Sequence, residues 1–210
     1  MLLSSGAGRR AMERAGKNVF GAAFTLAGMS IAGGLDPLIL GRAVEDMGSR
    51  LDDEAHAEFR IVYTEELTLE LRTAHTYALP GVAQLLGHLR GRSDVAVGLL
   101  TGNYHETGRL KLTAAGIDPD GFSPTFWGDQ AATRPGLVRL ALEGSEALEP
   151  ARVIVIGDTP HDVNCAKVND CRAVAVATGS FTPEELSDAG ADLTLADLSH
   201  SEPLLRLIDA

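Results

Sequence analysis

The stretch from Val153 to Asp162, which reads VIVIGDTPHD, constrains the fold more than any other part of the chain. Its first four residues are all β-branched and predict a strand buried on both faces, as in a parallel sheet. The strand stops at Gly157, and two carboxylates, Asp158 and Asp162, follow. Open α/β sheets bind their ligands at this carboxyl end of a strand. The stretch therefore predicts a parallel sheet with a functional site at its edge.

The two carboxylates allow two interpretations. Carboxylate oxygens near free backbone amides suit a hard cation such as Mg²⁺, which makes Asp158 and Asp162 candidate metal ligands. Asp-Thr-Pro is also common turn chemistry, so Asp158 or Thr159 could instead cap the helix that follows. This stretch alone leaves both interpretations open.

Strands and helices alternate in the part of the chain that follows Pro80. Strands are predicted at 95–100, 122–127, 153–156, 173–177 and 193–195. Helices are predicted after Pro80-Gly81, between Asn103 and Gly116, at 137–142, 161–168 and 183–189, and from about 202 onward. This alternation indicates the α/β class, with a doubly wound parallel sheet and right-handed crossovers.

The part before Pro80 is predicted to hold only helices and loops. Apolar residues at helical spacing predict helices at 7–20, 37–47 and 54–73, and Ser4 and Ser5 offer N-caps to the first. The stretch from Asn18 to Leu35 carries no charge, but it is short and rich in glycine. We interpret it as a helix end and a loop, with a membrane span as the alternative.

Composition and charge narrow the classes of function. The chain has 210 residues and a formal net charge of -11, which disfavours nucleic acid as a partner. Two cysteines, Cys165 and Cys171, build neither a disulfide framework nor a zinc site, and we expect both to be buried. No secretory signal is visible at the N-terminus, so we expect a cytoplasmic protein without membrane contact. We also expect a monomer or a homodimer, although no feature of the sequence decides between them.

Two further segments could contribute to the predicted site. Thr101, Gly102 and Asn103 close the strand at 95–100, and a hydroxyl with free backbone amides there can hold phosphate oxygens. Arg134 stands just before a predicted helix and could neutralise a phosphate. An ordinary Thr-Gly turn and a solvated surface arginine are the alternatives.

The order of these parts resembles the haloacid dehalogenase (HAD) superfamily of phosphohydrolases. Leu99 to Asn103 is similar to the second motif of that family, Arg134 stands in place of the lysine or arginine of the third, and Ile156 to Asp162 resembles the fourth. The stretches 6–12 and 173–179 resemble the branch that includes phosphoglycolate phosphatases. The resemblance covers nearly the whole chain.

The resemblance implies a domain division and a reaction. Residues 1–14 would lead from the core into a helical cap domain at 15–79, and residues 80–210 would form the α/β core. The reaction would be Mg²⁺-dependent hydrolysis of a small phosphorylated metabolite, such as phosphoglycolate or a sugar phosphate, through an aspartyl-phosphate. Asp158 and Asp162 would hold Mg²⁺, Arg134 and Thr101 would act in catalysis, and Gly102, Asn103 and Thr159 would bind substrate.

One departure from the family pattern bears on this reaction. The first motif, Asp-x-Asp-x-Thr, supplies the nucleophile and the general acid and base at the end of a central strand, and this sequence does not contain it. One explanation is that the natural protein begins upstream of Met1. The other is an inactive, phosphate-binding or regulatory relative in which the two neighbouring strands close up. We favour the first, because the loss of a central strand costs so much stability.

Other polar residues give weaker signals. Within the cap, Gly34 to Asp36, Arg9, Arg10 and Arg42 are places where substrate selection could lie, although a solvated charge or a helix cap is the simpler interpretation. Lys17 and Lys111 could form a Schiff base in principle, but nothing nearby marks either as desolvated. His161 lies between the two carboxylates, where a helix-start role is favoured.

Overall fold

The computed structural model describes residues 1–144 and 149–210. Its helices are α1 (Ala7–Phe20), α2 (Asp36–Asp46), α3 (Asp53–Leu71), α4 (Val82–Arg90), α5 (His105–Ala114), α6 (Arg134–Glu143), α7 (Pro160–Lys167), α8 (Pro183–Asp188) and α9 (Glu202–Ile208). Its strands are β1 (Leu2–Leu3), β2 (Tyr77–Ala78), β3 (Leu99–Leu100), β4 (Thr125–Phe126), β5 (Ile154–Gly157), β6 (Arg172–Val176) and β7 (Leu193–Leu195). Short 3₁₀ turns cover Pro119–Gly121 and Pro150–Arg152.

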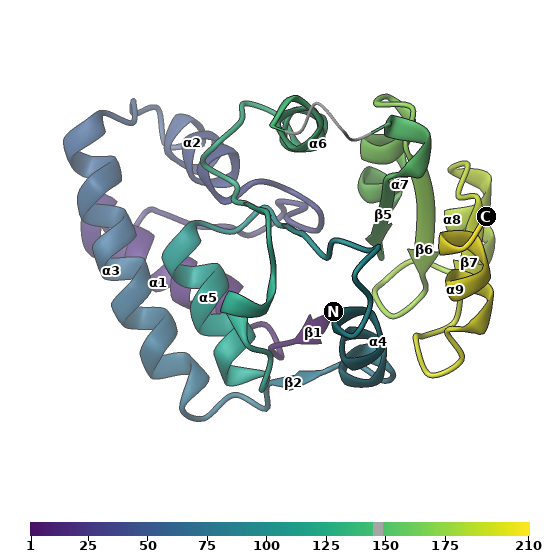
Figure 1. Cartoon of the computed structure of the whole chain (residues 1–210). Coiled ribbons are helices and arrows are strands. Elements are labelled where there is room, and N and C mark those ends of the chain that lie inside the picture. Colours follow the sequence, from purple (N-terminus) through teal and green to yellow (C-terminus); the bar gives the residue numbers. More distant parts are fainter. Residues whose placement is uncertain (145–148) are drawn as a thin grey trace.

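Helices α1, α2 and α3 lie together on one side of the molecule (Figure 1). One apolar cluster joins them, and its largest fully buried side chains include Phe24, Phe59 and Tyr63. Tyr104, which precedes α5, completes the cluster from the α/β part. The three helices match the predicted ranges within a few residues. The predicted serine caps of α1 are wrong, because Gly6, in the left-handed conformation at φ 76, occupies the N-cap position.

The parallel sheets confirm the predicted α/β class. Strands β5, β6 and β7 form one parallel sheet in that order, and β3 pairs with β4 in a second. The two-stranded antiparallel ribbon of β1 and β2 was not predicted. Helices α7, α8 and α9 gather around the larger sheet, opposite the side that holds α1 to α3 (Figure 1).

Strands β3 and β5 do not pair with each other in the described part of the chain. A cavity of about 340 Å³ is lined by residues of both strands, together with Met1 and Leu2. The prediction that the strand at 153–156 is buried on both faces is wrong, since Ile156 is 40% exposed. The reason is that β5 pairs with a strand, β6, along one edge only. A cavity that Ile156 lines lies where a second neighbouring strand would cover this side chain.

Two further apolar clusters hold the α/β part together. One joins α4, β3, α5 and α9 to the inner face of β6. The other cluster packs α6, α7 and α8 against β6, and its buried residues include Cys165, Cys171 and Leu186. Both cysteines are buried and free, as the sequence predicts. No helix among the described residues has the length and apolar character that a membrane crossing requires.

The loop before α2 docks directly on the loop after β3. The amide of Asp36 donates to the carbonyl of Gly102 at 2.7 Å. A Cβ on Gly102 would collide with the carbonyl oxygen of Gly34, so a glycine is required for this close approach. The carboxylate of Asp36 accepts from the amide of Tyr104 at 3.3 Å, at the N-terminus of α5. This contact fixes the helical part relative to the β3 loop.

Candidate functional site

The structure brings the predicted site residues of three separate segments to one place. Thr101, Arg134 and Asp158 come from the end of β3, the start of α6 and the end of β5. All three line the cavity between the strands and a neighbouring one of about 350 Å³, which extends toward α1 and α2. Asn103 and Asp162 line both cavities, whereas Gly102 and Thr159 line only the second.

Asp162 and Arg134 form an ion pair at the centre of the site. Both Nε and Nη2 of Arg134 donate to Oδ1 of Asp162, at 3.0 and 2.5 Å. The side chains are 17% and 7% exposed, so little water screens the pair. Arg134 also donates to the carbonyl of Gly33 at 3.4 Å. The pair fixes the guanidinium at the cavity wall, between the two sheets.

The other oxygen of Asp162 is occupied by the turn that starts α7. It accepts from the amides of Asp158 and Thr159 at 3.2 and 3.1 Å, and from the Thr159 hydroxyl at 2.8 Å. Thr159 is the N-cap, and the two residues form a capping box. The capping interpretation is therefore confirmed for Thr159. With both oxygens engaged, Asp162 can reach a cation only through a bridging water.

Asp158 is the carboxylate that faces the cavity. Its Oδ2 lies so near Gly179 that a Cβ there would approach it at 2.5 Å. Burial raises the pKa of Asp158 above its ordinary value, and the charge of Asp162 adds to this, while the Met1 ammonium and Arg134 oppose it. A negative charge at this position is costly, so a bound cation would stabilise it.

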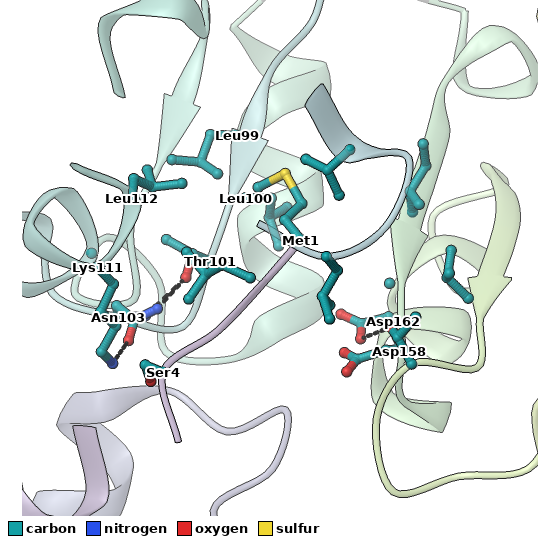
Figure 2. Close-up of a pocket in the computed structure, with 18 of the residues that line it drawn as sticks. Met1, Ser4, Leu99, Leu100, Thr101, Asn103, Lys111, Leu112, Asp158 and Asp162 are labelled. Carbon is teal, nitrogen blue, oxygen red and sulfur yellow. Dashed lines mark hydrogen bonds between the residues drawn. The ribbon is translucent and has the colours of Figure 1, made fainter. Parts of the chain in front are cut away.

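Figure 2 shows the opposite wall of the cavity, where three polar side chains form a connected row. Lys111 donates to Oδ1 of Asn103, and Nδ2 of Asn103 donates to Oγ1 of Thr101 at 2.6 Å. The backbone amide of Asn103 also approaches Oγ1 of Thr101, at 3.3 Å. Met1 lies between this row and the pair Asp158 and Asp162 in the same view.

The hydrogen bond of Lys111 to Asn103 is a part of the site that the sequence does not predict. Burial lowers the pKa of the Lys111 ammonium, with Asp36 as the opposing charge. Nothing near Lys111 in the sequence marks this desolvation. Gly8 of α1 lies close to its ammonium, and Tyr63 of α3 lines the same cavity. No local pattern around a lysine on α5 indicates packing against helices so far away in sequence.

The cap residues singled out from the sequence have different environments. Arg9 lines the second cavity and donates to the carbonyl of Leu26. Asp36 also lines it and is 7% exposed. Arg10 instead pairs with Glu70 on the surface at 2.7 Å. His161 is exposed at the start of α7, as the favoured interpretation has it.

The donor set fits a divalent cation only in part. Carboxylate oxygens suit Mg²⁺, which commonly keeps several waters and takes one or two protein carboxylates. Asp158, which faces the cavity, could provide one such ligand directly. The described residues contain no cluster of three or more His, Cys, Asp or Glu side chains that could hold a metal ion. A cation here would therefore depend on Asp158, water and the oxygens of a bound phosphate.

Comparison with known proteins agrees with this geometry. Residues 131–201, which include Arg134, Asp158 and Asp162, match the HAD-hydrolase-like family. No curated protein sequence matches the chain.

Solved structures match over nearly the full length. CbbY from Rhodobacter sphaeroides in complex with phosphate superposes with a TM-score of 0.77 at 18% identity, over 96% of this chain and 92% of that one. A hydrolase from Pseudomonas syringae gives 0.73 at 19% identity, over 96% and 91%. A predicted phosphoglycolate phosphatase from Haemophilus somnus gives 0.68 at 19% identity, over 98% and 93%. The chain therefore shares the fold of these structures, and the family match at residues 131–201 agrees with the predicted resemblance to the HAD superfamily.

Proposed function

We propose that this chain, which has the fold of the HAD-like hydrolases, belongs to a phosphatase-type hydrolase that acts on a small phosphomonoester. The observation that carries the proposal is the convergence of Thr101, Arg134 and Asp158 on shared cavities. A guanidinium and a hydroxyl are donors for phosphate oxygens, and a carboxylate is a ligand for the accompanying cation. The names of the similar structures, which include a phosphate complex and a predicted phosphatase, support the same class.

Each residue has a distinct task in the proposed reaction. Arg134, held by Asp162, would bind two oxygens of the transferring group and the negative charge that grows on them. Thr101 would donate its hydroxyl proton to a third oxygen. Asp158 would hold Mg²⁺, which when bound supplies positive charge against the phosphate oxygens. Asp162 would contribute to the cation through water.

Besides Asp158 and Asp162, the described residues bring one carboxylate to the two cavities, that of Asp36, which accepts from the amide of Tyr104. We propose that the nucleophile comes from an extended segment that lies between β3 and β5, in a form of the protein longer at its N-terminus. Its aspartate oxygen would attack phosphorus, and the bond to the leaving alcohol would break. A second aspartate of that segment would give its proton to the alcohol. That aspartate would then take a proton from water, which hydrolyses the aspartyl-phosphate.

The unpaired edges of β3 and β5 support this proposal. In the part of the chain that the structure describes, β3 pairs only with β4 and β5 only with β6, so one edge of each has no strand partner. Nearly all buried peptide groups are hydrogen-bonded, so a strand that pairs with these edges would stabilise them. The cavity between them is lined by apolar residues of both strands, including Leu99, Leu100 and Ile156. A short apolar strand would pair with both edges and would end beside Asp158.

A second candidate is a phosphate-binding or regulatory protein without turnover. It is favoured by the same observation, because Thr101, Arg134 and Asp158 on shared cavities would suffice to bind a phosphate group but would not supply a nucleophile. The substrate class in either case would be a small phosphorylated metabolite.

Hydrolysis assays separate the two candidates. The gene is read in frame upstream of Met1, and the chain is produced with and without that extension. We expect the extended chain to hydrolyse an aryl phosphate with Mg²⁺, and Asp158→Asn to reduce the rate by about a hundredfold or more. An upstream frame with stop codons, or an inert extended chain that still binds phosphate, would favour the second candidate.

A further inference from the structure

Lys111 has an environment that the proposed reaction does not explain. Its ammonium lies against Gly8 of α1, where an added Cβ would be 2.8 Å from Nζ. Among the described residues, no carboxylate lies within 4.0 Å to form an ion pair with it, and Asp36 acts only as a charge at longer range. The hydrogen-bond partner of the ammonium is the side chain of Asn103.

The chemistry of the Lys111 ammonium fixes the orientation of the Asn103 side-chain amide. An ammonium can only donate, so Asn103 must present its oxygen to Lys111. The amide nitrogen of Asn103 then faces Thr101 and donates to Oγ1 at 2.6 Å. Reversal of the amide would bring two donors together at Lys111 and would face an acceptor toward Thr101.

The orientation of Asn103 in turn determines what the Thr101 hydroxyl can do. A hydroxyl has two acceptor positions and one proton. Both acceptor positions of Oγ1 are used, by the side-chain amide of Asn103 at 2.6 Å and by its backbone amide at 3.3 Å. The proton of Thr101 is left to donate to a group in the cavities that this residue lines.

We propose that Lys111 is a positioning residue which, through Asn103, makes the Thr101 hydroxyl a dedicated donor to a phosphate oxygen. This inference rests on the proposed function and extends it, since it assigns a task to a residue outside the three converging groups. Without Lys111, the Asn103 amide is free to reverse. The Thr101 hydroxyl would then donate its hydrogen bond to Asn103 Oδ1 instead of to the anion.

The test is a double-mutant cycle on the binding of inorganic phosphate by the full chain, measured by calorimetry. Lys111→Met and Thr101→Val are each expected to weaken binding about tenfold. The double variant is also expected to be about tenfold weaker, because Lys111 acts through the hydroxyl that Thr101→Val removes. Lys17→Met, at an exposed lysine that pairs with Glu13, is the control and should bind as the parent does.

Two other outcomes of the cycle would overturn the proposal. A double variant that is about a hundredfold weaker would mean that Lys111 contacts the anion directly. Unchanged phosphate affinity in Lys111→Met, with a lower unfolding midpoint, would mean that the lysine only supports the packing of α5 against α1.

A second measurement tests the effect of Lys111 on Asn103 and needs no bound phosphate. In protein labelled with ¹⁵N-asparagine, the side-chain amide protons of Asn103 should exchange slowly with water, and at least tenfold faster in Lys111→Met. Equal exchange in the two proteins would refute the relay from Lys111 to Thr101. If the parent chain binds no phosphate, the proposed function fails, and the exchange comparison still confirms or refutes the relay.

Discussion

At the scale of single residues, the site contains two carboxylates with different surroundings: both oxygens of one accept hydrogen bonds, and the other carboxylate faces the cavity. Asp162 accepts from Arg134, from two amides and from a hydroxyl, whereas Asp158 faces the cavity. Sequence spacing could place both at the end of β5 but could not assign these separate tasks. The difference arises from Arg134, which comes from α6 and meets Asp162 only in the folded chain.

Asp158→Asn should stabilise the protein near neutral pH. Because burial and Asp162 raise the pKa of Asp158 in the folded state, the native carboxyl is most favourable when protonated. Stability is therefore lost as the pH rises from the ordinary pKa through the raised one. We expect the unfolding midpoint of the variant to exceed that of the parent by about 2–4 °C at pH 7, with a smaller gap at pH 4.

Calorimetric scans at the two pH values, without divalent ions, measure this difference. Mg²⁺ should then raise the midpoint of the parent but not that of Asp158→Asn, since the variant lacks the ligand. A variant that is less stable than the parent at pH 7 would contradict this account of Asp158.

Arg134→Met should cost about 3 kcal/mol of unfolding free energy, because it leaves the Asp162 carboxylate buried without its cation. Arg134→Met combined with Asp162→Asn should recover part of this loss, since the amide oxygen can still accept from the α7 turn. Urea titrations give both values. As a control, Lys167→Met breaks the exposed pair with Asp192 and should cost under about 1 kcal/mol. An equally small loss in Arg134→Met would refute the buried pair.

At the scale of elements, periodicity predicted the helices closely and the strands less well. The spacing of Phe59, Tyr63 and Leu67 identified α3, and all three side chains are buried in the helical cluster. The predicted strand at 95–100 is reduced to Leu99–Leu100, which pairs with β4 on one side only. The ribbon of β1 and β2 escaped prediction because each strand has two residues, too few for a pattern.

The contact between the β3 loop and the loop before α2 can be tested with a pair of glycines. Gly102→Ala should lower the unfolding free energy by about 2 kcal/mol, since its Cβ collides with backbone at Gly34. It should also weaken phosphate binding, because Thr101 and Asn103 flank it.

Gly41→Ala is the matched control, in the helix that this loop precedes. A Cβ there meets open space, and alanine is the better helix former, so a gain of about 0.5–1 kcal/mol is expected. Chemical denaturation of both variants provides the comparison. Similar stabilities for the two would rule out the tight docking at Gly102.

At the scale of the whole molecule, the site lies where two parallel sheets and a helical group meet. The β3 loop, the start of α6 and the end of β5 supply its polar groups, and α1 and α2 line the second cavity. The order of motifs along the sequence predicted this convergence. It could not show how the space between β3 and β5 is shaped, since that depends on which backbone edges pair.

Filling that space should stabilise the whole fold. In the N-terminally extended form proposed above, we expect amide protons of Leu100 and Ile156 to exchange at least tenfold more slowly, because a new strand would pair with both edges. Hydrogen exchange followed by NMR measures this for each residue. Exchange rates at β3 and β5 that do not change with the extension would argue against an inserted strand.

The most direct test of the central claim, that these residues bind a phosphate together with a divalent cation, is the affinity for inorganic phosphate measured by titration with and without Mg²⁺. The account predicts that Mg²⁺ tightens phosphate binding about tenfold in the parent chain, that phosphate tightens Mg²⁺ binding by the same factor, and that Asp158→Asn removes this coupling. Phosphate binding that is indifferent to Mg²⁺, or a coupling that survives in Asp158→Asn, would contradict it.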